Sequence, residues 1–154
     1  KYVYDKALVL ARKYDADIEI VLLGALLHDI ALIKKVGKRS NHHINGAKIA
    51  EEILNKYNYP QEKINRVKNC VLHHRTSFDA ENKEEVCVSD ADILSHFDNI
   101  PMIFDYAYKN YDVNLSNIRS FIKRYFENDY NDLSDKTKVI FKEEYENIMN
   151  VLFK

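Results

Sequence analysis

Glycine and proline are scarce in this chain, with 3 glycines and 2 prolines among 154 residues. A β sandwich or barrel with many tight turns needs more of both, so the scarcity argues against an all-β fold. It also leaves no room for a glycine-rich loop that wraps phosphate groups. Long helices are therefore the expected content.

Cysteines and long apolar runs are also scarce. The two cysteines, Cys70 and Cys87, form no CxxC pair and no disulfide framework, which favours a reducing, cytoplasmic compartment. The longest wholly apolar run, Ile20 to Leu27, has eight residues. A membrane-spanning helix needs roughly 20, and no apolar secretory segment opens the chain. We therefore expect no membrane partner.

Charge of one sign is missing as well, since 23 basic side chains nearly balance 24 acidic ones. Without a basic field or a basic stripe interleaved with aromatics, nucleic acid is not an expected partner. The apolar share of 46% and the charged share of 31% are typical of a globular protein rather than a disordered one. The length fits one domain covering residues 1–154.

The spacing of the apolar residues predicts an all-α bundle of six to eight helices. The helix expected at about 18–33 is apolar nearly all round, which is typical of a central buried helix. The final helix has a stripe that either closes the core or forms a homodimer interface. The expected helices cover about 2–14, 18–33, 45–57, 60–75 and 86–97, followed by one that opens at Pro101 and two in the last 40 residues.

The histidines are not scattered, because five of the six fall in three places: His28 before Asp29, the pair His42-His43, and the pair His73-His74. An aspartate-rich segment, Asp90-Ala91-Asp92, follows. Helical spacing continues the apolar stripe of helix 18–33 to His28 and Asp29, and that of helix 60–75 to His74.

Polar groups at core-facing positions need partners, since burying an unpaired imidazole or carboxylate costs several kcal/mol. One metal ion satisfies several of them at once. Mixed imidazole and carboxylate ligands suit Mn, Fe, Co, Ni or Zn better than Mg, although Mg is possible.

Each of these features also has a simpler interpretation. A single histidine on an apolar face is usually hydrogen-bonded within the core or at the surface, and an aspartate such as Asp90 or Asp92 can cap a helix or face solvent. The coincidence of four acid or imidazole clusters in one small domain nevertheless favours a metal site.

The order of these motifs resembles the HD superfamily of metal-dependent phosphohydrolases, in particular its small single-domain bacterial and archaeal members. The resemblance covers about residues 2–97, which would form the motif-bearing core, with further helices at about 101–154. The matching phrases are Leu26-Leu27-His28-Asp29-Ile30, His42-His43-Ile44-Asn45-Gly46-Ala47-Lys48-Ile49-Ala50, His74-Arg75 and Ser89-Asp90-Ala91-Asp92-Ile93-Leu94.

The resemblance implies a site for one or two divalent ions. His28 and Asp29 would be the signature ligands, Asp92 the closing ligand, and His42 and His74 the ligands of a second position. His43 and His73 rank below their neighbours as ligands, and Asp90 would orient a ligand rather than bind the ion.

The implied activity is hydrolysis of a nucleotide or another small phosphate ester by a metal-activated water. Asp29 and Arg75 are the expected catalytic residues, with Arg75 as a bidentate phosphate clamp. A loop with Lys34, Lys35, Lys38 and Arg39 either attracts the phosphate of the substrate or is a solvated basic turn. Two alternatives stay open: a degenerate HD domain that binds a nucleotide or partner without catalysis, and a diiron oxygenase on the same frame.

The sequence departs from the family pattern at one point. The family carries a ligand histidine on its opening helix, and no histidine precedes His28 here. The rhythm of Val3 and Ala7 would place it one or two residues before Lys1, so we expect the sequence to be truncated just past it. If that histidine is absent, one metal position is weakened.

Overall fold

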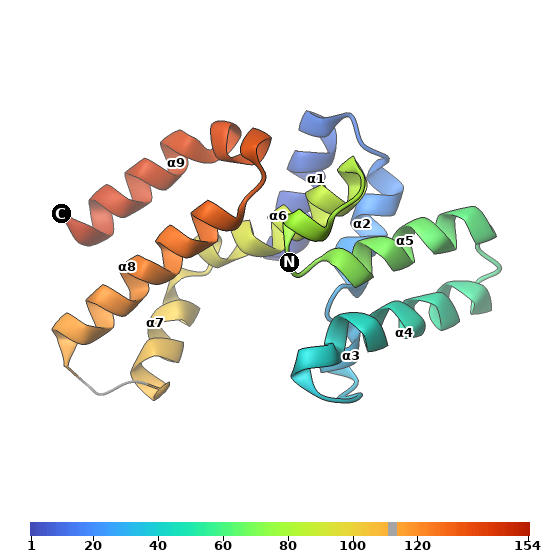
Figure 1. Cartoon of the computed structure of the whole chain (residues 1–154), viewed down its shortest axis with the longest axis horizontal. Coiled ribbons are helices and arrows are strands. Elements are labelled where there is room, and N and C mark those ends of the chain that lie inside the picture. The colour runs from blue at the N-terminus through green and yellow to red at the C-terminus, as the bar shows by residue number, and fades with distance from the viewer. Residues whose placement is uncertain (111–113) are drawn as a thin grey trace. The chain divides into compact units, whose positions relative to one another are not determined.

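The computed structural model describes residues 1–110 and 114–154, and the regular elements in those residues are all helices (Figure 1). The all-α prediction is therefore confirmed; residues 111–113, within the predicted C-terminal helical part, lie outside the described residues. In chain order the elements are α1 (Tyr2–Tyr14), α2 (Ile18–Leu27), α3 (Ile30–Ile33), η1 (Arg39–Asn41), α4 (His42–Lys56), α5 (Gln61–His73), η2 (Ser77–Asp79), α6 (Lys83–Asp98), α7 (Ile100–Asn110), α8 (Leu115–Asp132) and α9 (Asp135–Phe153).

The chain divides into two compact units. The first comprises Lys1 and Val3–Asp92, and the second comprises Tyr2 and Ile93–Lys154. In the described residues of both, no helix combines the length and the apolar composition needed to cross a bilayer.

In the first unit, α5 packs against both α4 and α2, and α3 packs against α4 (Figure 1). The predicted stripe of Ile64, Val67 and Val71 on α5 is fully buried. Close packing of α2 depends on Gly24, because a Cβ there would lie 2.7 Å from the Cβ of Cys70. The stripe on α5 thus forms the centre of this unit, and its direction leads to His74.

The single helix expected at 18–33 is wrong, because α2 ends at Leu27 and α3 begins at Ile30. Asp29, at the junction, has φ −103° and ψ 16°, and its carbonyl oxygen accepts hydrogen bonds from the backbone of Leu32 and Ile33. The expectation of burial all round also fails, since Leu26 is 58% exposed. An unbroken apolar pattern does not reveal such a break, because one junction in a different backbone conformation leaves the apolar composition unchanged.

Two other helices begin earlier than predicted. Helix α4 starts at His42 rather than near residue 45, and α6 starts at Lys83 rather than near residue 86. Their first turns carry polar side chains, which an apolar periodicity cannot detect. In α6 two of these polar side chains, Glu84 and Glu85, are nevertheless buried.

Charged groups fasten the start of α2 to the rest of the first unit. The Asp17 carboxylate accepts hydrogen bonds from the backbone of Glu19 and Ile20 and so caps the helix. Arg66 on α5 places Nη1 3.0 Å from Asp17 and Nη2 3.3 Å from Glu84 on α6. This arginine therefore joins three helices at the end of the unit where α2 begins.

In the second unit, α8 packs against α7 and α9 (Figure 1). The core of this unit contains aromatic side chains. The ring of Phe97 lies 4.9 Å from that of Phe126 and 5.1 Å from that of Phe141, centroid to centroid. Along α9, Phe141 is buried whereas Val151 is 84% exposed. The first half of this helix thus closes the core, and a homodimer interface stays a prediction.

Candidate metal centre

The ends of several helices in the first unit bring together the histidines and aspartates singled out from the sequence. His28 and Asp29 form the junction between α2 and α3, His42 is the first residue of α4, and His74 directly follows α5. Asp92 lies on α6. Because α5 packs against α2 and α4, these positions converge although they are far apart in the sequence.

The contacts centre on Asp29. Its Oδ1 lies 3.2 Å from His42 Nε2 and 3.8 Å from His74 Nε2, and its Oδ2 lies 3.6 Å from His28 Nε2. His28 Nε2 is also 3.4 Å from Asp92 Oδ1. One potential ligand atom each from Asp29, His42 and His74 all lie within 4.8 Å of one another. We call His28, Asp29, His42, His74 and Asp92 the cluster.

All three histidines of the cluster are oriented in the same way. Each Nδ1 lies 2.7 or 2.8 Å from the backbone carbonyl oxygen three residues earlier in the chain. A carbonyl oxygen only accepts hydrogen bonds, so Nδ1 carries the proton in each ring. In the neutral ring Nε2 then presents a lone pair, and the three lone pairs are directed into the cluster. Fixing the outer nitrogen in this way is how proteins orient metal-binding imidazoles.

The Nε2 atoms of His42 and His74 lie 3.0 Å apart, which is a hydrogen-bond distance. With both Nδ1 atoms protonated, two neutral rings have no proton to share there. His74 is only 2% exposed, and burial lowers its pKa to about 4, so that ring is neutral near pH 7. A cation coordinated by both nitrogens resolves this opposition, and the residues present therefore fit a divalent metal.

His28 has a different balance of forces. Burial lowers its pKa, but the hydrogen bond and charge of Asp92, with the charge of Asp29, outweigh burial and leave the pKa above its ordinary value. Without a metal, a proton on Nε2 is therefore stabilised between two carboxylates. The same arrangement favours any other cation at that position.

Gly46 permits the close approach of α4 to the junction that carries His28 and Asp29. A Cβ at this glycine would lie 3.4 Å from the carbonyl oxygen of His28 and 3.1 Å from Val71. The glycine one turn after His42 therefore sets the distance between the two histidines that α4 and α2 contribute.

The lower-ranked candidates lie differently. His73 directs Nδ1 to Glu85, at 2.8 Å, and that carboxylate is fully buried. The Nδ1 of His43 is buried and makes no hydrogen bond with the described residues, and burial, with the charge of Arg75, lowers the pKa of His43. Asp90 is fully buried. The preference for His74 over His73 thus agrees with the geometry.

The predicted phosphate-binding residues lie outside the cluster. Arg75 is exposed, and its Nη1 donates to the carbonyl oxygen of Ser40 at 3.4 Å. The exposed cations of the loop before α4 are Lys34, Lys35, Lys38 and Arg39. All of them belong to segments that adjoin cluster residues in the sequence.

Sequence reasoning missed Glu85 and Asn45. Glu85 lies before the start of the helix expected at about 86–97, and the only sequence signal of its burial is the apolar Val86-Cys87-Val88 directly after it. Asn45 hydrogen-bonds the carbonyl oxygen of Val36 at 3.4 Å and so supports the loop before α4. Nothing in the sequence pattern distinguishes this asparagine from a surface residue.

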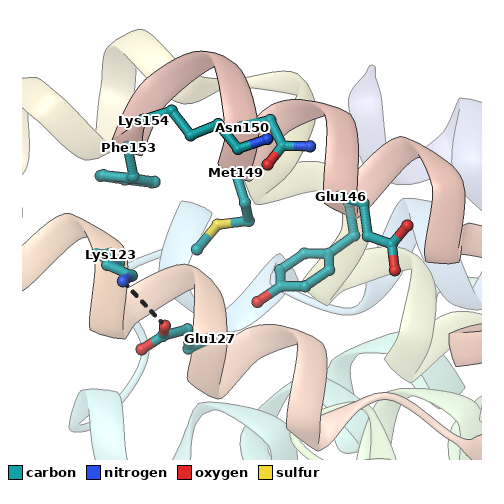
Figure 2. Close-up of a pocket in the computed structure, with 8 residues that line it drawn as sticks. Lys123, Glu127, Glu146, Met149, Asn150, Phe153 and Lys154 are labelled. Atoms are coloured by element: carbon teal, nitrogen blue, oxygen red, sulfur yellow. Dashed lines mark ion pairs between the residues drawn. The ribbon is translucent and has the colours of Figure 1, made fainter.

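A separate pocket of about 420 Å³ lies in the second unit, between α8 and α9 (Figure 2). It mixes both charges, and Lys123 lies 3.9 Å from Glu127 on its wall. None of the residues predicted to bind metal or substrate lines it. The lining residues are Lys123, Glu127, Tyr145, Glu146, Met149, Asn150, Phe153 and Lys154.

The helical fold and the cluster define a class of protein, an all-α domain with a candidate metal centre of histidines and aspartates. Comparison with known families identifies it: the model of the HD domain family matches residues 2–96. This chain belongs to the HD domain family. The matched segment contains all five residues of the cluster.

Individual relatives add little to this assignment. An uncharacterized protein from Clostridium beijerinckii is 37% identical over 57 residues, which are 37% of this chain and 36% of that protein. The match thus spans little more than a third of that relative. No solved structure matches the chain.

Proposed function

We propose that this protein is a metal-dependent phosphohydrolase that cleaves a nucleotide or another small phosphate ester. The observation that carries the proposal is the convergence of three imidazole Nε2 atoms and two carboxylates in one unit. Opposed lone pairs at 3.0 Å, fixed by hydrogen bonds on the far side of each ring, are costly without a cation between them.

The two oxygens of Asp29 face different partners. Oδ1 faces His42 and His74, whereas Oδ2 faces His28, which also contacts Asp92. This carboxylate is therefore arranged to bridge two ion positions, one on each side. His42 and His74 would hold one ion, and His28 and Asp92 the other.

A divalent ion in this cluster supplies a water of lowered pKa and polarises the phosphoryl oxygens. The protein residues would orient the metal ligands. The backbone carbonyls fix the three imidazole rings, and Asp29 would set the spacing of the two ion positions. Arg75 is exposed and directly follows His74, and it would form paired hydrogen bonds with a phosphate of the substrate.

Metal analysis and a substrate panel test the proposal. Protein purified without chelator should contain one to two transition ions per chain. It should hydrolyse members of a phosphatase and phosphodiesterase panel when Mn, Co or Ni is added. Asp29→Ala removes the shared ligand, so we expect activity to fall by about a thousand-fold or more.

Asp5→Ala is the matched control, because Asp5 is an exposed aspartate on α1. It should leave both metal content and activity unchanged. Full activity in Asp29→Ala would contradict the proposed ligand set. Bound metal with no hydrolysis would favour a domain that senses a nucleotide or partner, and oxygen consumption would favour a diiron oxygenase.

A further inference from the structure

The loop of residues 34–41, here called the basic loop, concentrates positive charge. Four cations lie within six residues, namely Lys34, Lys35, Lys38 and Arg39, and all are exposed. No acidic residue occurs in the sequence between Asp29 and Glu51. Within residues 1–110 and 114–154, no ion pair is formed by these four side chains, whereas Arg66 and Lys68 of the same unit are paired with carboxylates.

Both ends of the basic loop are fixed at the cluster. Helix α3 and then the loop follow directly from Asp29, and η1 leads directly into His42. The carbonyl oxygen of Arg39 accepts the Nδ1–H of His42 at 2.7 Å, so the loop itself orients a cluster histidine. The segment that carries the unpaired charges therefore begins and ends close to cluster residues in the chain.

Lys35 adopts φ +56°, in the left-handed region that lysine rarely occupies. This conformation ends α3, with the backbone N–H of Val36 donating to Ala31 at 2.9 Å. In the described part of the chain, the other non-glycine residues with positive φ are Asp15 and Asn58, which are of the types that tolerate it. Glycine would adopt this conformation at lower cost, so the lysine side chain is held here against a backbone preference.

The shape of the loop is also supported from α4. Gly37 has φ +73°, and a Cβ there would lie 2.2 Å from Asn45 Nδ2, the atom that hydrogen-bonds Val36. Asn45 therefore fits against the loop only because residue 37 is glycine. The backbone of the basic loop is thus supported by a contact from α4.

We propose that the basic loop binds the additional phosphates of a polyphosphate substrate, such as the triphosphate chain of a nucleotide, while the cluster acts on the phosphate that is cleaved. This inference rests on the proposed function and names the substrate class. Four unpaired cations exceed what one phosphate group can neutralise, and lysines act as point charges that accommodate a flexible chain. The charge is confined to one short loop and the whole protein is balanced, which favours a short phosphate chain over a long nucleic acid.

Calorimetric binding of inorganic tripolyphosphate and of orthophosphate, with chelator present, tests the loop without catalysis. Wild-type protein should bind tripolyphosphate at least about ten-fold more tightly than orthophosphate. The loop variant, Lys34→Gln with Lys35→Gln, Lys38→Gln and Arg39→Gln, should lose that preference. A surface variant with the same charge change, Arg12→Gln with Lys13→Gln, Lys48→Gln and Lys56→Gln, should keep it. Equal tripolyphosphate binding by wild type and the loop variant, or equal loss in both variants, overturns the proposal.

Kinetics with added Mn separate this inference from the proposed function. In the loop variant, kcat/KM for a nucleoside triphosphate should be lower by about ten-fold or more, mainly because KM rises. The kcat/KM for the corresponding nucleoside monophosphate should change by less than about three-fold. Equal losses for both substrates overturn the inference and leave the hydrolase intact. If wild type hydrolyses neither of these substrates nor any member of the phosphatase and phosphodiesterase panel, the hydrolase proposal fails. Tripolyphosphate binding then still decides whether the loop is an anion site.

A single substitution gives a sharper readout. Lys35→Gly removes one charge and relieves the left-handed backbone, so it should raise the thermal midpoint while weakening tripolyphosphate binding. Asn58→Gly relieves a similar conformation without a charge change and should not alter tripolyphosphate binding. If Lys35→Gly binds tripolyphosphate like wild type, Lys35 takes no part in recognition.

Discussion

Histidines and aspartates meet in both units of this protein, but they are used differently. In the cluster of the first unit, each Nδ1 donates to a backbone carbonyl and each Nε2 faces other polar side chains. In the second unit, His96 directs Nδ1 to the Asp129 carboxylate at 2.8 Å, with the Tyr125 hydroxyl 3.4 Å away. His73 and Glu85 repeat this second arrangement within the first unit.

The difference separates an ordinary ion pair from the candidate metal centre. Where Nδ1 contacts a carboxylate, the histidine and its partner satisfy each other whether or not the ring is protonated. Where Nδ1 donates to a backbone carbonyl, the Nε2 atom of the neutral ring keeps an unpaired acceptor. Several such Nε2 atoms that meet at one point need a shared cation. The hydrogen-bond partner of each Nδ1 therefore indicates a metal site better than the number of histidines does.

The largest expected effect comes from exchanging the two kinds of histidine. His28→Gln removes a ligand and should weaken metal binding about a hundred-fold or more. His96→Gln should leave metal binding unchanged and lower the free energy of unfolding by about 1–2 kcal/mol through the lost bond to Asp129. Isothermal titration with Mn and chemical denaturation measure the two effects.

Stability offers an independent readout of the same exchange. At a metal concentration a hundred times the Kd, binding should stabilise wild type by about 2.7 kcal/mol. His96→Gln should retain this stabilisation and His28→Gln should lose it. The reverse pattern would place the metal in the second unit and would contradict the assignment of the metal site to the cluster.

An effect of intermediate size concerns the pH dependence of the chelated protein. The pKa of His74 falls from 6.5 unfolded to about 4 folded because the ring is buried. Between these values only the unfolded chain binds the proton, so stability should fall by about 3 kcal/mol as the pH falls from 6.5 to 4. Denaturation at several pH values, with His74→Gln as reference, isolates this contribution.

His28 should act in the opposite direction and in a separate pH range. Its folded pKa lies above 6.5, so its contribution to stability is complete below pH 6.5 and is lost as the pH rises through the folded pKa. His28→Gln should remove this loss on the alkaline side. A wild-type profile without any change attributable to either histidine would contradict the burial and contacts assigned to them.

The fold was largely readable from the sequence where burial is apolar. The stripe of Ile64, Val67 and Val71 predicted both the packing of α5 and the direction of His74. The break at Asp29 was not readable, since it depends on a backbone conformation that the apolar composition does not encode. Helix starts with polar first turns were missed for the same reason.

The cluster was readable because His28, Asp29 and His74 extend apolar stripes and because all five residues occur in a family order. The roles of individual histidines were harder to predict from the sequence. His73 and His74 are adjacent, and only the contact with the buried Glu85 shows that His73 is already paired with a carboxylate. The support of the basic loop by Asn45 is a tertiary contact without local sequence signal. Polar contacts between residues far apart in the sequence could not be predicted from the apolar pattern.

The smallest expected effect concerns Ser89, which lies three residues before Asp92 on α6 and is fully buried. Its Oγ makes no hydrogen bond to the described residues. Removing an unsatisfied hydroxyl from a packed site relieves a desolvation cost, so Ser89→Ala should raise the free energy of unfolding by up to about 1 kcal/mol. Metal titration of the same variant decides whether Ser89 contributes to the cluster. Unchanged metal affinity leaves Ser89 outside the cluster. Weakened metal affinity would add its hydroxyl to the groups that support Asp92.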